Sequence, residues 1–493
     1  MKPTMKILLL LVCGNFISSC NVKEVGENNP QITEHELQMH IDYLASEELE
    51  GRGIGSEGLE SAAKYVIGQF HGSGINTFSS KTIKNYLQTL EINKSKLSSE
   101  TSLRYNSLET TYFKYGSEYI MYHFGLNGAD ILEGEVVFTG TGIYEPEYQY
   151  QDYNTEDVRN KWIVINELVP TELKDFLPDS LYNLYADIRT GSTLRAVKAH
   201  ENGAIGVLTI PSNMGYKLWD IRAKAFKEFH DQDNYGSFYR NAPIPMLFID
   251  STMNAILKES VTSNKTQGKL VLNKGLEKEK ISSSNIIGFV EGTDPVLSKE
   301  FIVIGAHIDH MGIIDSIIYN GANDDASGTT AVIELAEAIA DNPMKRSVIF
   351  TIFTAHEVGV IGSTFFIENP PVPLENIKSM VHFDMIGRSD SEVNKIALVS
   401  PYLPYDYWKN VIKKIKFQDG ASLIDWEYSE SFPYKYAGDH YPFFSKGIPS
   451  MMLFSGYNPD YHMPTDDSDK IDYKFLKQNA ELSYSIIKVL ANE

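Results

Sequence analysis

Side chains that can bind a metal ion or move a proton recur in the second half of the chain, where apolar segments end. His307 directly follows the segment FIVIGA, and Asp309 comes two residues later. His356 and Glu357 directly follow SVIFTIFTA. Asp324 lies in the segment GANDDASG, Asp384 lies at the end of SMVHFDM, and His462 lies in YHMPTDD. Taken singly, a strand-end Asp is usually a turn residue. Five ordered sites of this kind predict a metal centre, and two imidazoles with three carboxylates suit zinc.

The segments that position these residues alternate between strand and helix from Asn285 onward. The predicted strands are NIIGFVEG, FIVIGAH, SVIFTIFTA, SMVHFDM and PSMMLF, and residues 326–340 and 473–490 are predicted helices. The run 347–355 is nearly all apolar, as expected for a central strand that is covered on both faces. The alternation predicts a layered α/β domain with the polar side chains at the carboxyl edge of its sheet.

Five motifs together resemble those of the co-catalytic di-zinc aminopeptidases. They are His307-x-Asp309, GANDDASG, HEVGVIGS, FDMIG and YHMP. The resemblance covers residues 283–493 and the segment LASEELEGRGIGSEG near the amino terminus. The zinc exopeptidase superfamily that contains these enzymes also includes glutamate carboxypeptidase and the glutaminyl cyclases. The resemblance implies an α/β fold, a three-layer α/β/α sandwich around a mixed, mostly parallel central sheet.

The resemblance also implies a role for each metal-capable residue. His307 and Asp384 would bind a first Zn²⁺, Glu357 and His462 would bind a second, and Asp324 would bridge the two. A bridging carboxylate is needed because two cations about 3.5–4 Å apart repel each other. A zinc-bridging water or hydroxide would then attack the peptide bond. Manganese or cobalt could occupy the same ligands.

Several neighbours of this set have supporting roles by the same resemblance. Asp309 would accept a hydrogen bond from the His307 imidazole and fix its tautomer. Tyr461 falls where some family members place a phenol that stabilises the tetrahedral intermediate. The segment GDHYPF resembles one that lines the family's pocket, which leaves Asp439 and His440 open between that role and a structural one. Two more histidines are interpreted as support or core residues: His310 and His382.

One position departs from the family pattern. Active aminopeptidases have a second glutamate, the general base, where this chain has His356 in TAHEVG. Three interpretations stay open. His356 is itself the base, for which an ordinary pKa of about 6.5 is suitable; or it coordinates a metal; or hydrolysis is lost and the protein binds peptides. The complete ligand set favours activity.

The middle of the chain has a different pattern of predicted strands and helices from the part that follows it. Residues 131–282 contain the predicted strands EGEVVFTG, KWIVINE and PIPMLFID and the helix–turn–strand segment STLRAVKAHENGAIGVLTI. This combination resembles the protease-associated domain, a small β-rich α+β module. We expect it to be inserted between residues 32–130, the amino-terminal part of the peptidase domain, and residues 283–493, the catalytic part.

The amino terminus has the pattern of an export signal. Lys2 and Lys6 precede a short apolar stretch, and the sequence ISSC ends at Cys20. ISSC resembles a bacterial lipobox, so we expect residues 1–20 to be a lipoprotein signal peptide with its lipidated cysteine, and residues 21–31 to be a tether. The protein would be anchored to a bacterial membrane without spanning it. The lack of Asp after Cys20 favours the outer membrane, with a periplasmic or surface-facing position open.

The net charge of the chain bears on whether it could bind nucleic acid. The 493 residues include 44 Lys and Arg against 65 Asp and Glu, which gives a net charge of −21. A field of this sign repels phosphate backbones, so nucleic acid is not an expected partner. No apolar run approaches the roughly 20 residues of a membrane-spanning helix.

Together these features predict an exported, zinc-dependent metallo-aminopeptidase, a hydrolase that removes N-terminal residues from peptides. A carboxypeptidase of the glutamate type is the near alternative, and recognition of a free carboxylate in place of a free amine would separate the two. The alternative from another class is a catalytically weakened, peptide-binding lipoprotein, because His356 replaces the usual base.

Overall fold

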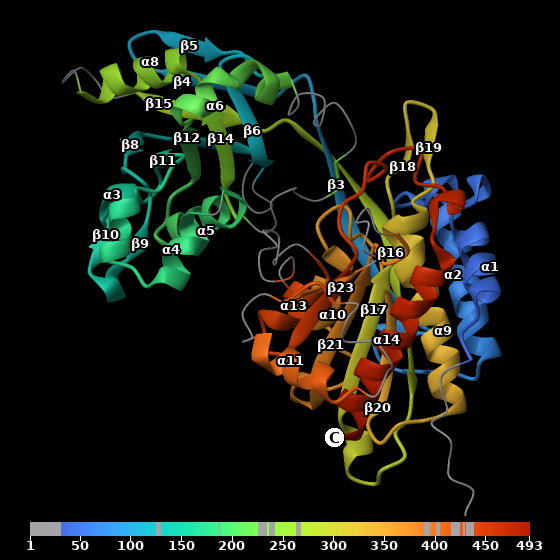
Figure 1. The fold of residues 1–493 in the computed structure, drawn as a ribbon. Helices are drawn as coiled ribbons and strands as arrows, with labels where there is room; N and C mark the ends of the chain where they lie inside the picture. Colours follow the sequence, from blue (N-terminus) through green and yellow to red (C-terminus); the bar gives the residue numbers. More distant parts are fainter. Residues whose placement is uncertain are drawn as a thin grey trace, which may run out of the picture.

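A larger α/β part and a smaller part make up the computed structural model (Figure 1). It describes residues 31–124, 130–186, 188–224, 234–235, 242–262, 268–388, 395–400, 405–415, 424–426, 429 and 438–493. The predicted signal peptide with Cys20, and all of the predicted tether except Gln31, lie outside these residues. Within the described residues, no helix has the length and apolarity needed to cross a membrane.

The larger part is built on a mixed sheet with the strand order β13-β3-β16-β20-β17-β21-β23-β22. Four central strands are parallel to one another: β20 (Ser347–Phe353), β17 (Phe301–His307), β21 (Ile377–Asp384) and β23 (Ser450–Phe454). The flanking strands pair antiparallel: β22 (Ala397–Val399) on one side, and β16 (Leu276–Val290), β3 (Leu87–Leu97) and β13 (Asn234–Tyr235) on the other. Every residue of β20 is buried, as its apolar sequence predicts. The predicted mixed α/β sheet is confirmed.

Helices cover both faces of this sheet (Figure 1). Alternate residues of a strand face opposite sides. In β20, Val348, Phe350 and Ile352 join one apolar cluster, whereas Ile349 and Phe353 join another. The first cluster includes residues of α1 (Glu34–Leu44), α2 (Glu57–Gly72), α9 (Ser327–Asp341) and α14 (Tyr473–Asn492), and the second includes residues of α10 (Ile361–Glu368) and α13 (His440–Phe444). The larger part therefore has three layers, α/β/α.

Local sequence determines where the outer helices begin. Thr33, Ser56 and Asp472 precede α1, α2 and α14, and the side chain of each accepts a hydrogen bond from the backbone N–H three residues later. Such caps satisfy backbone donors that have no partner inside the helix. The caps therefore fix the residues at which α1, α2 and α14 begin.

The smaller part contains two further sheets. Their orders are β6-β14-β12-β11-β8 and β5-β4-β15-β7. The first comprises β6 (Tyr119–Phe124), β14 (Pro245–Ile249), β12 (Gly206–Ile210), β11 (Trp162–Asn166) and β8 (Val136–Phe138), and the second comprises β5 (Thr110–Phe113), β4 (Ser102–Asn106), β15 (Lys269–Asn273) and β7 (Ile131–Gly134). Trp162 and Leu247 share an apolar cluster with Leu103 and Leu270, so the two sheets pack together. Strands β4, β5 and β6 lie before residue 131, the predicted start of the insertion. A protease-associated identity stays a prediction.

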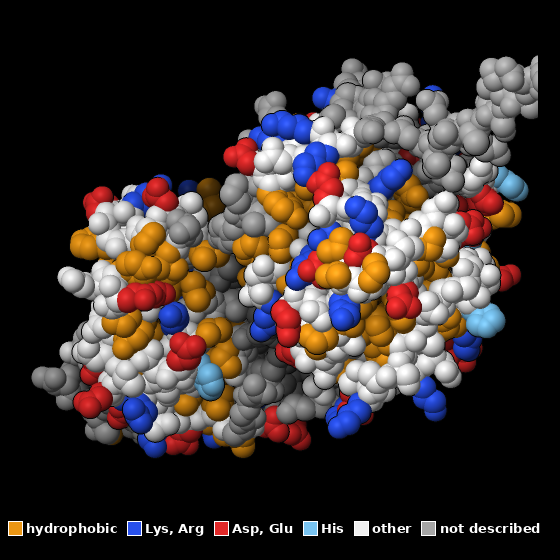
Figure 2. Space-filling model, turned by 90° about the horizontal axis from the view of Figure 1, so that it is seen from below, with side chains coloured by type: hydrophobic (Ala, Val, Ile, Leu, Met, Phe, Trp, Pro, Cys, Tyr) orange, Lys and Arg blue, Asp and Glu red, His pale blue; other side chains and the backbone are white. Residues whose placement is uncertain are grey.

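Charged side chains are interspersed on the face of the molecule that Figure 2 shows. Lys, Arg, Asp and Glu lie singly or in small groups among apolar side chains over both parts (Figure 2). Neither sign of charge forms a broad patch on this face. The groupings of charge that could do chemistry lie instead inside the larger part, at the carboxyl edge of its sheet.

Candidate metal centre

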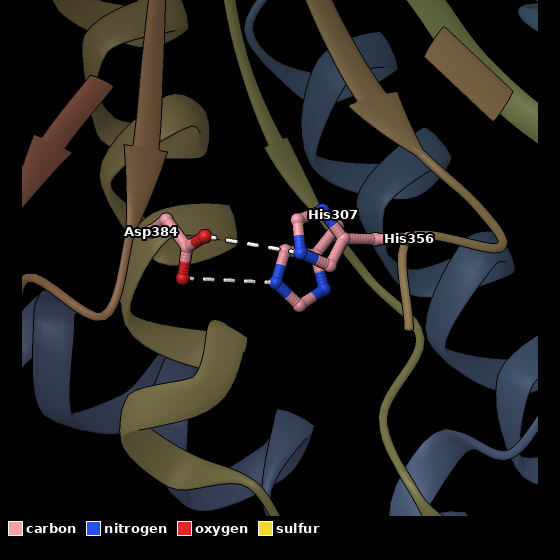
Figure 3. Close-up of side chains that lie close together, drawn as sticks. All are labelled: His307, His356 and Asp384. Carbon is pink, nitrogen blue, oxygen red and sulfur yellow. Dashed lines mark ion pairs between the residues drawn. The ribbon is translucent and has the colours of Figure 1, made fainter. Parts of the chain in front are cut away.

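The parallel strands bring polar side chains to one edge of the central sheet. His307 is the last residue of β17 and Asp384 the last of β21, while His356 and Glu357 follow the end of β20. Because parallel strands end at the same edge, these residues meet although the chain separates them. Figure 3 shows Asp384 facing the two imidazoles, His307 and His356, with one carboxylate oxygen toward each ring.

The loop before α9 supplies Asp324. The buried Asp466 carboxylate holds this loop by accepting hydrogen bonds at 3.1 Å from the backbone N–H groups of Asn323 and Asp324. Gly321 opens the loop with φ 61°, and a Cβ there would lie 2.3 Å from the Asp324 carbonyl oxygen. The sharp turn therefore needs glycine, and it leaves the Asp324 side chain directed into the cluster.

Asp324 lies between two imidazoles. Its Oδ1 is 3.4 Å from His307 Nε2, and its Oδ2 is 3.2 Å from His462 Nε2. His462 Nε2 is also 3.3 Å from Glu357 Oε2, and His307 Nε2 is 3.9 Å from Asp384 Oδ1. The structure thus brings all five predicted metal residues together, with Asp324 in the middle position.

The donor set fits divalent cations. The Nε2 atoms of His307 and His462 are buried and have no hydrogen-bond partner among the described residues. Two ligands bonded to one zinc at about 2.0–2.1 Å lie roughly 3.4 Å apart at a tetrahedral angle, close to the distances around Asp324. Burial opposes the charge on His462, but Glu357 and Asp324 outweigh it and raise the pKa of this imidazole to about 11. The same negative charge of Glu357 and Asp324 also favours a divalent cation at this position.

Asp309 occupies a different place from the expected one. Its backbone carbonyl, not its carboxylate, lies 3.0 Å from His307 Nδ1. The carboxylate accepts hydrogen bonds from the backbone N–H groups of His356, at 3.0 Å, and Glu357, at 3.1 Å. The His307 ring still donates from Nδ1, which leaves Nε2 free toward Asp324. The Asp309 side chain instead fixes the turn that carries His356 and Glu357.

Tyr461 lies beside the cluster. Its ring stacks on that of His462, with centroids 3.9 Å apart. Burial, followed by the charges of Asp324 and Glu357, raises the pKa of the Tyr461 phenol well above its usual value. The hydroxyl therefore stays protonated and can act only as a hydrogen-bond donor or neutral acceptor.

His356 is held at three points. Its Nδ1 lies 2.7 Å from Asp439 Oδ2, its Nε2 lies 3.8 Å from Asp384 Oδ2, and its ring stacks on that of His307 with centroids 3.8 Å apart. Because the Asp439 carboxylate can only accept, His356 donates from Nδ1. Its Nε2 therefore carries the lone pair on the side of the cluster.

Two buried residues escaped the sequence analysis. The guanidinium of Arg52 donates to the backbone carbonyls of Leu44, Ile308, Asn320 and Gly321 and so ties together the loops behind the cluster. Burial lowers its pKa to about 10. Asp466 holds the Asp324 loop, as described above. Arg52 lies inside the segment LASEELEGRGIGSEG, whose resemblance to the family was the available signal for it.

The sequence matches the model of "Peptidase family M28" over residues 285–487. Aminopeptidase YwaD of Bacillus subtilis (strain 168) is 27% identical over 213 residues, which cover 41% of this chain and 43% of that protein. Leucine aminopeptidase 1 of Ajellomyces capsulatus (strain NAm1 / WU24) is 23% identical over 216 residues, 40% of this chain and 55% of that protein. The chain therefore spans about half the length of the curated relatives it matches.

A solved structure shares the fold over nearly the whole chain. It is the aminopeptidase from Aneurinibacillus sp. strain AM-1, with a TM-score of 0.52 and 19% identity, and the alignment covers 93% of this chain and 94% of that one. Residues 285–487, which match the model of peptidase family M28, contain every residue of the cluster, and the chain is similar to aminopeptidases in sequence over this part and in fold over nearly its whole length.

Proposed function

We propose that the protein is a zinc-dependent aminopeptidase that hydrolyses N-terminal residues from peptides. The observation that carries the proposal is the convergence of three carboxylates and two imidazoles at the carboxyl edge of the sheet, with Asp324 at 3.4 Å from His307 and 3.2 Å from His462. The aminopeptidases among the relatives support the same reaction class.

Two ions would be held by separate halves of this cluster. His307 and Asp384 would hold the first, Glu357 and His462 the second, and Asp324 would contribute one oxygen to each. Bound divalent cations lower the pKa of water and polarise a carbonyl group. Zinc suits the nitrogen and oxygen donors best, although other divalent metals could use them.

His356 would move the proton. Its Nδ1–H is engaged by Asp439, so only Nε2 can accept a proton on the side of the cluster. Burial and His307 disfavour the charged ring, but Asp439 and Asp384 outweigh them and raise the pKa of His356 above its ordinary value. The imidazolium formed in this way could return the proton to the departing amine. Tyr461, which stays neutral, would donate a hydrogen bond to the oxygen of the tetrahedral intermediate.

Hydrolysis of matched peptides tests the proposal. The full chain, loaded with two zinc ions per chain, is assayed with peptides that are free or blocked at each end, with Glu357→Ala as background. Turnover that requires a free amino terminus supports an aminopeptidase. Turnover that requires a free carboxyl terminus supports the glutamate-carboxypeptidase type instead. Rates equal to the background, with metal bound, leave peptide binding as the function, which is the alternative that His356 raises.

Export and anchoring are a separate part of the proposal. The lipobox-like ISSC supports lipidation at Cys20 and attachment to a bacterial membrane, with the peptidase on the exported side. Labelling of cells with a radioactive fatty acid tests this, and Cys20→Ser is the matched control. Equal label in the two proteins would contradict lipidation.

A further inference from the structure

His382 lies next to the metal centre but outside its five ligands. It stands two residues before Asp384 on β21, so both side chains project from the same face of the strand. The ring is fully buried, and its Nδ1 lies 3.2 Å from the carbonyl oxygen of Gly305. A carbonyl can only accept, so the hydrogen of the neutral ring is on Nδ1, and Nε2 carries a lone pair.

That lone pair faces two carboxylates. His382 Nε2 is 3.7 Å from Asp439 Oδ2 and 3.8 Å from Asp384 Oδ2, and no described residue makes a hydrogen bond to it. Protonation would not complete a hydrogen bond, because both distances exceed the usual limit of about 3.2 Å. The 3.7 Å distance to Asp439 is a few tenths of an ångström longer than the roughly 3.3–3.5 Å between two atoms bonded tetrahedrally to one zinc.

Asp439 completes a compact donor set with His356. Ligand atoms of His356, His382 and Asp439 all lie within 4.8 Å of one another. Asp439 Oδ1 accepts a hydrogen bond from Ser363 Oγ at 2.5 Å, which leaves Oδ2 directed toward the two imidazoles. His382 is held in a similar way, because its Nδ1 donates to the Gly305 carbonyl. Contacts of this kind orient metal ligands and are typical of built metal sites.

We propose that His356 Nδ1, His382 Nε2 and Asp439 bind a third divalent cation of the zinc class beside the two-ion centre. Two imidazoles and one carboxylate favour a borderline transition metal over magnesium or calcium. The three residues come from the ends of β20 and β21 and from the start of α13, and none of them is among the five ligands of the two-ion centre.

Occupation of this site would regulate hydrolysis, an extension that rests on the proposed function. The third ion must replace the hydrogen that His356 Nδ1 donates to Asp439. A neutral imidazole with a metal on Nδ1 carries its hydrogen on Nε2. His356 then has no lone pair toward the cluster and cannot accept the proton, so the third ion would inhibit the enzyme.

Metal counting on the full chain tests the site. The protein is saturated with Zn²⁺, passed through a desalting column and analysed for zinc per chain by mass spectrometry of the element. We expect three zinc ions in the wild type and two in His382→Asn, which keeps a donor for the Gly305 carbonyl but removes Nε2. His71→Asn, an exposed histidine in the last turn of α2, is the matched control and should keep three.

A second variant and the rate give independent outcomes. Asp439→Asn should also bind two ions, which keeps the test decisive if His382→Asn does not fold. The wild-type rate should fall by about tenfold or more between two and three zinc ions per chain, and His382→Asn should lack this fall. Two ions in the saturated wild type, or three in a folded His382→Asn, would overturn the third site. Absent hydrolysis at two ions per chain would instead overturn the proposed function, and the zinc count would still decide the third site.

Discussion

The larger and the smaller part of the molecule bury charge in opposite ways. At the sheet edge of the larger part, Asp324, Glu357 and Asp384 form their close ion pairs with histidines. In the smaller part, the carboxylate of Glu167 has a protein cation as its partner: Arg222 Nη1 lies 2.7 Å from Glu167 Oε1. Buried charge normally requires a fixed partner or a metal. The smaller part supplies the partner, whereas the larger part supplies donors that a cation would complete.

Removal of metal should give the largest difference between the two parts, because only the larger part is expected to depend on a bound cation. Chelation, or Asp324→Ala, should lower kcat/KM by at least about 10⁴-fold, because this one carboxylate would serve both ions of the proposed centre and water would lose its activation. Peptide hydrolysis before and after chelation, with restoration by Zn²⁺, measures the effect. Glu167→Gln in the smaller part should leave the rate within about twofold. Full activity of Asp324→Ala would show that the cluster is not the metal centre.

Substitution of His356 should have the next largest effect. At two zinc ions per chain, His356→Ala should lower kcat about 10²- to 10³-fold while KM and the two bound ions stay unchanged, because only proton transfer is lost. His356→Glu restores the family's usual base and should recover much of the rate. Steady-state kinetics with metal analysis on the same samples checks both. Fewer than two zinc ions per chain in His356→Ala would mean that His356 binds one of the two ions of the proposed centre, as one interpretation of the sequence holds.

The contrast also explains what the sequence could predict. His307, Glu357 and Asp384 lie at or just after the ends of apolar strands, and parallel strands end at one edge, so the convergence of these three follows from local pattern. Asp324 and His462 come from the loops before α9 and after β23. The place of Asp309 does not follow, because a main-chain carbonyl can reach His307 Nδ1 as well as a carboxylate can. The third-site geometry was beyond prediction, since His382 and Asp439 meet only through packing of α13 against β21.

The boundaries of the smaller part also depend on contacts that the sequence pattern does not predict. Residue 131 was predicted as the start of the insertion from the pattern of its strands and helices. In the structure, β4 pairs with β15 and β6 pairs with β14, so strands on both sides of residue 131 share sheets. Such pairings join segments that are far apart in the sequence, and no local pattern encodes them. Central strands such as β20 are predictable because burial on both faces leaves an apolar run.

A buried arginine offers a third prediction, confined to the smaller part. Arg195 is 1% exposed and donates to the carbonyl groups of Thr141, Asn166 and Glu167. Arg195→Met leaves these carbonyls without donors and should destabilise the smaller part by about 3 kcal/mol. Hydrogen exchange of peptides from β11 and α5 (Ile188–Glu201) should become faster. Zinc content should not change, because Arg195 contacts none of the cluster residues. A lower zinc content would show that the smaller part supports the metal centre.

The smallest effect concerns Glu167 and depends on pH. Burial alone would raise its pKa, but hydrogen bonds from Ser212 and the pairing with Arg222 outweigh burial and lower the pKa below 4.5. A carboxyl group whose pKa is lower in the folded state stabilises that state above the unfolded pKa, and this contribution is lost as the pH falls through the folded pKa. Glu167→Gln should therefore destabilise the smaller part by about 1.5 kcal/mol at pH 7. Thermal unfolding of both proteins from pH 7 to pH 3 should show the difference shrink with acidification, because the protonated wild-type side chain resembles glutamine. A difference that is independent of pH would mean that the shape of the side chain, and not its charge, supports this part of the fold.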